Sequence, residues 1–252
     1  NFGDALIEMN GALGLEIEQA AELLQTMYEA GYITYPRTRA RAFTAAGVDA
    51  IERLAAAKGL RGFRREYVTV VQKGSPHEAL RILDEALYQR LDLGKPARLQ
   101  PTARDAALVL IARRSLESGI AVRRDFPDLR SAPQWARAID WHRDLRDSIL
   151  PWPALQEKSV VQHDRKVALL RAMMEAGIGR PSTWVAHAAK LASRPFLDSR
   201  LCLTPKGREV LTYTPPSLRD AGICASVEKL LDREDIPVSE LVVQALRQAL
   251  GA

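Results

Sequence analysis

Helical periodicity constrains this sequence more than any other feature. Apolar side chains recur at intervals of three and four residues from Ile17 to Tyr28, and Gly31 follows as a helix stop. Similar patterns, with capping residues or glycine stops, predict helices at 44–57, 101–114, 165–175, 183–193, 218–232 and 238–250, and a short one from 204. Strand signals are confined to 67–72, 131–162 and 196–203. We therefore predict a mainly α fold with a small β part, an α+β multidomain chain.

Composition excludes several classes of protein. No apolar run reaches eighteen residues, and the start of the chain has neither the basic nor the apolar region of a signal peptide, so we expect a cytoplasmic protein without a membrane partner. Two cysteines, Cys202 and Cys224, are too few for a disulfide framework or a four-cysteine zinc site. The net charge of +5 permits a nucleic-acid partner without requiring one. The first residue is not methionine, which is compatible with a piece of a longer polypeptide.

The C-terminal part contains a recognisable order of elements. A helix at 165–176, a glycine-rich turn, a helix at 183–193 and a candidate hairpin at 196–203 are typical of a winged helix-turn-helix. Such a unit can place its second helix on DNA. A plain helical hairpin with no nucleic-acid role fits the same pattern, and both interpretations stay open.

The segment 31–38 contains residue types suited to phosphoryl chemistry. Tyr35 follows a helix stop and so lies on a connection, where its hydroxyl can act as a covalent nucleophile. Arg37, two residues later, can hold a phosphate oxygen bidentately. Tyr32 is a competing candidate for the nucleophile. The alternative is an ordinary turn tyrosine beside a surface arginine.

Two further segments carry polar side chains on predicted loops. In 75–81, proline precedes His77, an imidazole that can titrate near neutral pH or donate to a phosphate. In 177–183, two glycines and Arg180 precede Ser182 and Thr183, which can cap the next helix and leave its amides to cradle a phosphate. The alternatives are a solvated loop histidine and an ordinary capped turn.

Taken together and in this order, the three segments resemble the type IA DNA topoisomerases. They read Tyr-Ile-Thr-Tyr-Pro-Arg-Thr at 32–38, His-Glu-Ala-Leu-Arg at 77–81 and Gly-Ile-Gly-Arg-Pro-Ser-Thr at 177–183. The resemblance covers 1–42, 75–83 and 163–212. It is loose at 100–124 and nearly absent at 125–162.

The resemblance implies a reaction and a role for each matching residue. Family members cut one DNA strand, hold its 5′ end as a phosphotyrosine, pass another strand through the gap and reseal it. Tyr35 then matches the nucleophile, Arg37 the arginine beside the scissile phosphate, and His77 a histidine that assists proton movement or binds DNA. The implied contacts to single-stranded DNA come from Arg81, Arg180, Ser182, Thr183 and Arg194.

The resemblance also implies a missing domain. The family's Toprim domain carries a glutamate and an Asp-x-Asp-x-Glu run that binds Mg²⁺, and this sequence contains no Asp-x-Asp. We therefore expect Mg²⁺ in a Toprim domain supplied in cis or by a separate chain, and no metal ligands here. Arg39 and Ile82 also replace an acidic residue and a proline of the family pattern. The chain is then an excised portion, a subunit, or a non-cleaving relative that binds DNA or serves as a scaffold.

On this interpretation the chain divides into three domains. Residues 1–124 form a helical domain carrying Tyr35, 125–162 a β-rich arch segment, and 163–252 a winged-helix-like domain lining the single-strand groove. We expect association with the nucleoid. Whether the task is relaxation, decatenation or action on RNA stays open.

Overall fold

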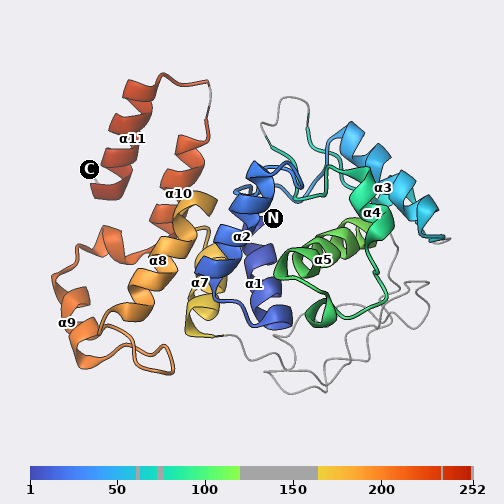
Figure 1. Cartoon of the computed structure of the whole chain (residues 1–252). Coiled ribbons are helices and arrows are strands. Elements are labelled where there is room, and N and C mark those ends of the chain that lie inside the picture. Colours follow the sequence, from blue (N-terminus) through green and yellow to red (C-terminus); the bar gives the residue numbers. More distant parts are fainter. Residues whose placement is uncertain (61–62, 73–76, 120–163, 234, 251–252) are drawn as a thin grey trace, which may run out of the picture. The chain divides into compact units, whose positions relative to one another are not determined.

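The computed structural model describes residues 1–60, 63–72, 77–119, 164–233 and 235–250, and these are mostly helical (Figure 1). The α-helices are α1 (Phe2–Leu13), α2 (Ile17–Glu29), α3 (Ala45–Ala57), α4 (Glu85–Arg90), α5 (Ala103–Glu117), α7 (Arg165–Glu175), α8 (Pro181–Ser193), α9 (Pro205–Tyr213), α10 (Ala221–Leu231) and α11 (Val238–Leu250). The same ranges contain the short 3₁₀ helices η1 (Arg65–Tyr67), η2 (Ala97–Leu99) and η5 (Pro216–Arg219). None of the helices in these ranges is long and apolar enough to cross a membrane.

The predicted helices are confirmed, and their ends follow the capping residues. Thr44 accepts a hydrogen bond from the backbone of Gly47 at the start of α3, and Thr102 does the same for Asp105 at the start of α5. Proline occupies the first turn of α8 and of α9, where its missing N–H costs nothing. The mainly α fold class is therefore confirmed.

Of the predicted strands within the described residues, one is absent and one hairpin is present. The predicted strand at 67–72 is wrong, because η1 occupies its first residue and only Val70 makes a bridge, parallel to Phe43. The hairpin at 196–203 is confirmed as a tight reversal with one antiparallel bridge between Leu197 and Leu203. Asp198 closes it by accepting hydrogen bonds from the amides of Arg200 and Cys202. The arch segment 125–162 and the strands expected at 131–162 lie outside the described residues.

The chain separates into two compact units, which we describe separately. The first contains Asn1, Gly11–Gly14 and Glu22–Gln162, and the second contains Phe2–Asn10, Leu15–Ala21 and His163–Ala252. Side chains that are at most 3% exposed form each core. In the first unit these include Leu24, Met27, Ile33, Val48, Ile51, Leu54, Ile82, Leu108 and Leu116; in the second they include Phe2, Leu6, Met9, Ile17, Ala20, Val167, Leu170 and Ala188.

Most of helix α1 belongs to the second unit because of its packing contacts. One face of α1 is buried and carries Phe2, Leu6 and Met9. Gly3 lies so close to Met174 and Trp184 that a side chain at this position would overlap the methionine. Lys166 on α7 also donates to the carboxylates of Glu16 and Glu18, both at 2.9 Å. The start of the chain therefore packs with α7 and α8.

Candidate active-site tyrosine and its surroundings

The segment that carries Tyr35 is set by a left-handed glycine after α2. Gly31 has a φ of 76°, its amide donates to the carbonyl of Tyr28, and the amide of Tyr32 donates to the carbonyl of Met27, both at 2.9 Å. This pair of bonds ends the helix and reverses the chain. Ile33, directly after the reversal, is fully buried. The glycine stop and the buried isoleucine together fix where the tyrosine segment leaves the helix.

A short antiparallel pairing joins the Tyr35 segment to the segment after His77. Ile33 bridges Ile82, the amide of Thr34 donates to the Arg81 carbonyl at 3.0 Å, and the amide of Leu83 donates to the Tyr32 carbonyl at 2.9 Å. The buried Thr34 hydroxyl donates to the Ala79 carbonyl and accepts from the Arg81 amide, both at 3.0 Å. The first two sequence motifs, more than forty residues apart, therefore lie side by side.

This pairing brings the candidate catalytic side chains into contact. The rings of Tyr35 and His77 lie 4.8 Å apart between centroids, with an interplanar angle of 31°. The ring of Tyr28, from the last turn of α2, lies 5.3 Å from that of Tyr35 at an angle of 78°. Tyr35 is half-buried and His77 is exposed. The phenol is therefore held by two neighbouring rings and stays accessible at the surface of the first unit.

Tyr32, the competing candidate, has a different environment. The Arg104 guanidinium lies 5.4 Å from the centre of its ring, in cation–π range. No ring contact joins Tyr32 to His77 within the part of the chain that the structure describes. The contact with the histidine thus distinguishes Tyr35 from Tyr32.

The residues around Tyr35 project Arg37 outward. Pro36 and Thr38 are buried, and the amide of Thr38 donates to the Pro36 carbonyl at 2.8 Å across a tight turn. The Thr38 hydroxyl accepts from the amide of Ala40 at 2.9 Å. Arg37 sits at the tip of this turn with its side chain exposed. Its position suits contact with a phosphate arriving from solvent.

A buried ion pair supports the loop between His77 and Ile82. Arg81 donates to the Glu78 carboxylate at 2.9 Å, and the two side chains are 12% and 11% exposed. The same carboxylate accepts from the amide and the hydroxyl of Thr44, at 2.9 and 2.8 Å. Burial raises the pKa of Glu78, but the bonds from Arg81 and Thr44 outweigh it and the pKa lies below its ordinary value. The Arg81 guanidinium is therefore engaged in the ion pair with Glu78. The contact of Arg81 with DNA stays a prediction.

Tyr88 supports the same segment from the core. Its hydroxyl donates to the Ile82 carbonyl at 3.2 Å, and burial raises the pKa of this phenol to about 12. The phenol therefore stays protonated and keeps its donor at any physiological pH. This bond holds the chain immediately after the second motif.

The third motif lies in the second unit, at the start of α8. Gly177 and Gly179 both have positive φ, 69° and 72°, which glycine alone adopts without strain. Arg180 pairs with Glu228 at 2.6 Å and with Asp232 at 3.0 Å. Arg180 is the N-cap residue of α8, and its amide donates to the Thr183 hydroxyl at 3.2 Å as part of a capping box, while Ser182 is exposed. The predicted capped turn is present, and its arginine is held by Glu228 on α10 and by Asp232 directly after that helix.

Trp184 and Arg194 belong to the same unit. Trp184 is 5% exposed and its indole N–H donates to the Ile178 carbonyl at 2.9 Å, so it is a core residue and offers no ring to a DNA base. Arg194 follows α8, is exposed, and its guanidinium lies 5.8 Å from the centre of the Phe196 ring. Arg194 therefore remains accessible for the predicted DNA contact.

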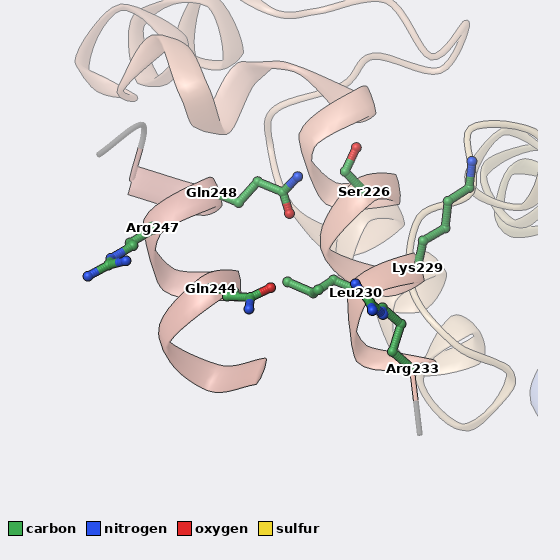
Figure 2. Close-up of a pocket in the computed structure, with 7 residues that line it drawn as sticks. All are labelled: Ser226, Lys229, Leu230, Arg233, Gln244, Arg247 and Gln248. Carbon is green, nitrogen blue, oxygen red and sulfur yellow. The ribbon is translucent and has the colours of Figure 1, made fainter. Parts of the chain in front are cut away.

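A pocket between α10 and α11 has a volume of about 520 Å³. Figure 2 shows its basic lining residues: Lys229 on α10, Arg233 just after it, and Arg247 on α11. Arg233 is already paired with Asp235. Residues 221–250 carry three basic and five acidic residues, so the surrounding charge disfavours a phosphate chain. We do not assign this pocket to DNA.

Known proteins similar to this chain in sequence or in fold include two topoisomerases. No protein-family model matches the sequence. A curated relative, DNA topoisomerase 1 of Synechocystis, is 27% identical over 269 aligned residues, which cover 89% of this chain and 30% of the relative. Full-length topoisomerase I from Thermotoga maritima has a similar fold, with a TM-score of 0.64 at 15% identity over all of this chain and 48% of that one. This chain is similar to a fragment of a type I DNA topoisomerase.

The topoisomerase likeness concerns part of a larger molecule. The chain spans less than a third of the curated relative's length and about half of the solved chain. Within the described residues, no group of three or more His, Cys, Asp or Glu side chains is arranged to hold a metal ion. We assign no Mg²⁺ ligand among these described residues, and we derive no step through a metal bound to them.

Several residues that shape the surroundings of Tyr35 carry no functional signal in the sequence. Tyr28 appeared only as an apolar position of a helix, and Thr34, Thr44 and Glu78 had no assigned role. The helix stop at Gly31 was the usable signal for Tyr28, because it returns the chain past the last turn of the helix. No local signal links Thr44 to Glu78, since their contact spans 34 residues.

The packing around Glu78 yields a stability prediction. A Cβ added at Gly47, in the first turn of α3, would lie 2.5 Å from the Glu78 carboxylate and 2.9 Å from the Arg81 guanidinium. Glycine to alanine in a helix normally stabilises by about 1 kcal/mol. Here overpacking of the ion pair costs about 1–3 kcal/mol, so we expect Gly47→Ala to lower the midpoint of thermal unfolding by several degrees.

Gly11→Ala is the matched control, because Gly11 is an exposed glycine in α1. We expect that variant to unfold at the wild-type midpoint or above it. Circular dichroism measures the unfolding midpoint of both variants. A Gly47→Ala midpoint equal to that of Gly11→Ala would contradict the packing described around Glu78.

Proposed function

We propose that this chain is the tyrosine-bearing part of a type IA DNA topoisomerase. In this proposal it cleaves and rejoins one DNA strand through a 5′-phosphotyrosine and allows another strand to pass through the gap. A Toprim domain, in cis or in trans, completes the active site. The observation that carries the proposal is the contact of the Tyr35 and His77 rings at 4.8 Å, from two segments that backbone pairing brings together.

The covalent step exchanges one phosphodiester for another. The Tyr35 hydroxyl oxygen attacks the scissile phosphorus and the bond from phosphorus to the 3′ oxygen of the preceding nucleotide breaks. The phenol loses its proton and the departing 3′ oxygen gains one. Because no phosphodiester is hydrolysed, religation by the reverse attack needs no nucleotide cofactor.

Two neighbouring side chains suit the charge changes of this step. Attack places negative charge on the non-bridging phosphate oxygens, and an exposed guanidinium two residues from the nucleophile can hold them. Arg37 has that position. His77 contacts the Tyr35 ring and can bind the DNA or assist the phenol's proton. Magnesium chemistry belongs in this proposal to the Toprim domain.

Single-stranded DNA is the proposed ligand of the chain itself. We expect it to bind an oligonucleotide more tightly than a duplex of the same sequence at the same salt, with affinity falling steeply as salt rises. Arg37→Ala should weaken binding and lower the log–log salt slope by about 0.7, the value for one phosphate contact on a single strand. Fluorescence anisotropy titrations over a salt series measure both quantities.

Arg53→Ala is the matched control for this experiment. Arg53 is also exposed but is already paired with Glu85, so its loss should leave the salt slope unchanged. Equal affinities for single strands and duplex, or an Arg37→Ala slope equal to that of Arg53→Ala, would contradict the assignment of Arg37.

A second candidate function is a non-cleaving DNA-binding or scaffold protein of the same descent. Arg39, where the family pattern has an acidic residue, favours it. Formation of a covalent DNA adduct by the chain together with a Toprim-bearing segment excludes this alternative. Single-strand binding with no adduct under those conditions supports it.

A further inference from the structure

We propose that Tyr28 is a positioning residue that sets the direction of the Tyr35 phenol for attack. This inference rests on the proposed function and deepens it. The starting observation is the edge-type contact of the two rings, 5.3 Å between centroids at an interplanar angle of 78°. Tyr28 lies outside all three sequence motifs. Its contact with Tyr35 arises because the reversal at Gly31 returns the chain past the last turn of α2.

The platform that carries Tyr28 is fixed. Its helical neighbours Leu24 and Met27 are 0% and 1% exposed, so the core holds the register of α2. The Tyr28 carbonyl accepts the amide of Gly31, one of the two bonds that end the helix. Tyr28 itself is 39% exposed, so burial of its ring in the core does not explain its position.

The tyrosine that it contacts needs such support. Backbone bonds anchor Thr34 before Tyr35, and buried Pro36 follows it, so the backbone is restrained on both sides. The Tyr35 side chain still turns about two torsions, and its phenol oxygen lies far from this anchor. Ring contacts limit those torsions, and an edge contact prefers one relative orientation over others. A helix-borne ring is therefore suited to hold the phenol in one direction.

A second observation separates this role from that of His77. The histidine ring contacts Tyr35 at a tilted angle of 31° from a position outside any helix, whereas Tyr28 contacts it at 78° from a helix. His77 carries groups that can move a proton or bind phosphate. The orienting part of Tyr28 is its ring, and its hydroxyl is dispensable.

The experiment measures single-turnover cleavage at saturating single-stranded DNA by the chain joined with a Toprim-bearing segment. We expect Tyr28→Leu to slow cleavage about tenfold with unchanged DNA affinity, because orientation of the nucleophile affects the reacting complex alone. Tyr28→Phe should keep nearly the wild-type rate, since it retains the ring. The midpoint of thermal unfolding should be unchanged in both variants.

Tyr67→Leu serves as the matched control. Tyr67 is 51% exposed in the same unit, and among the described residues no ring contact involves it. A rate for Tyr28→Leu equal to that of Tyr67→Leu overturns the positioning role and leaves the proposed function in place. A loss of DNA affinity with an unchanged rate at saturation also overturns it, because Tyr28 would then bind DNA. Absence of cleavage by the unmutated protein overturns the proposed function and this inference with it.

Discussion

Tyr35→Phe is expected to abolish strand cleavage by the chain assembled with a Toprim-bearing segment. The substitution removes the one oxygen that forms the ester with phosphorus, and no neighbouring group replaces it. Product should fall below detection in a cleavage assay on a labelled oligonucleotide. The effect should be far larger than that of any substitution around the tyrosine, because these change only the rate of a step that remains possible.

Binding and stability should survive this change. Phenylalanine keeps the ring contacts of Tyr35 with Tyr28 and His77, and the tyrosine is only half-buried. Tyr32→Phe is the control, because it deletes a hydroxyl from a ring of the same segment that contacts Arg104 instead of His77. Undiminished cleavage by Tyr35→Phe, or its loss in Tyr32→Phe alone, would contradict the assignment of the nucleophile.

The 252-residue chain alone is expected not to relax supercoiled DNA, with or without Mg²⁺. Its described residues hold no cluster of metal-ligating side chains, and its sequence contains no Asp-x-Asp run. In this prediction the charge that develops on the phosphate needs a metal ion beside the arginines, and the Toprim-bearing segment supplies that ion. Addition of a Toprim-bearing segment should restore relaxation, seen as a ladder of topoisomers on an agarose gel.

Relaxation by the purified chain without that segment would show that the missing acidic groups are not needed. Tyr35→Phe is the control for contamination, because a contaminating topoisomerase would relax DNA equally in both preparations. The same pair of proteins therefore tests the autonomy of the chain and the identity of its nucleophile.

Sequence patterns predicted the helices well because their signals are local. Thr44, Thr102 and the glycine after α2 each act on backbone groups within one helical turn. Helix α1 was missed, although Phe2, Leu6 and Met9 already repeat at helical spacing. The 67–72 stretch was mistaken for a strand because β-branched composition alone does not supply a pairing partner, and only Val70 found one.

The candidate site was predicted residue by residue but not as an arrangement. The motifs identified Tyr35, Arg37 and His77, yet their proximity depends on the pairing of Ile33 with Ile82, a contact between distant segments. The burial of Arg81 against Glu78 and the pairing of Arg180 with Glu228 likewise involve partners that no local pattern specifies. Side chains expected to meet DNA are in these two places held by carboxylates of the protein itself.

Peptide mapping of a trapped adduct shows whether Tyr35 becomes covalently joined to DNA. The chain with its Toprim-bearing segment is incubated with a single strand labelled at its 3′ end or at the scissile phosphate, denatured during cleavage and digested with a protease. We expect one labelled peptide, which contains residues 32–37 and carries the label on Tyr35 when sequenced. A label on Tyr32, on Tyr28 or on any other residue would contradict it, as would a wild-type protein that cleaves DNA without forming an adduct.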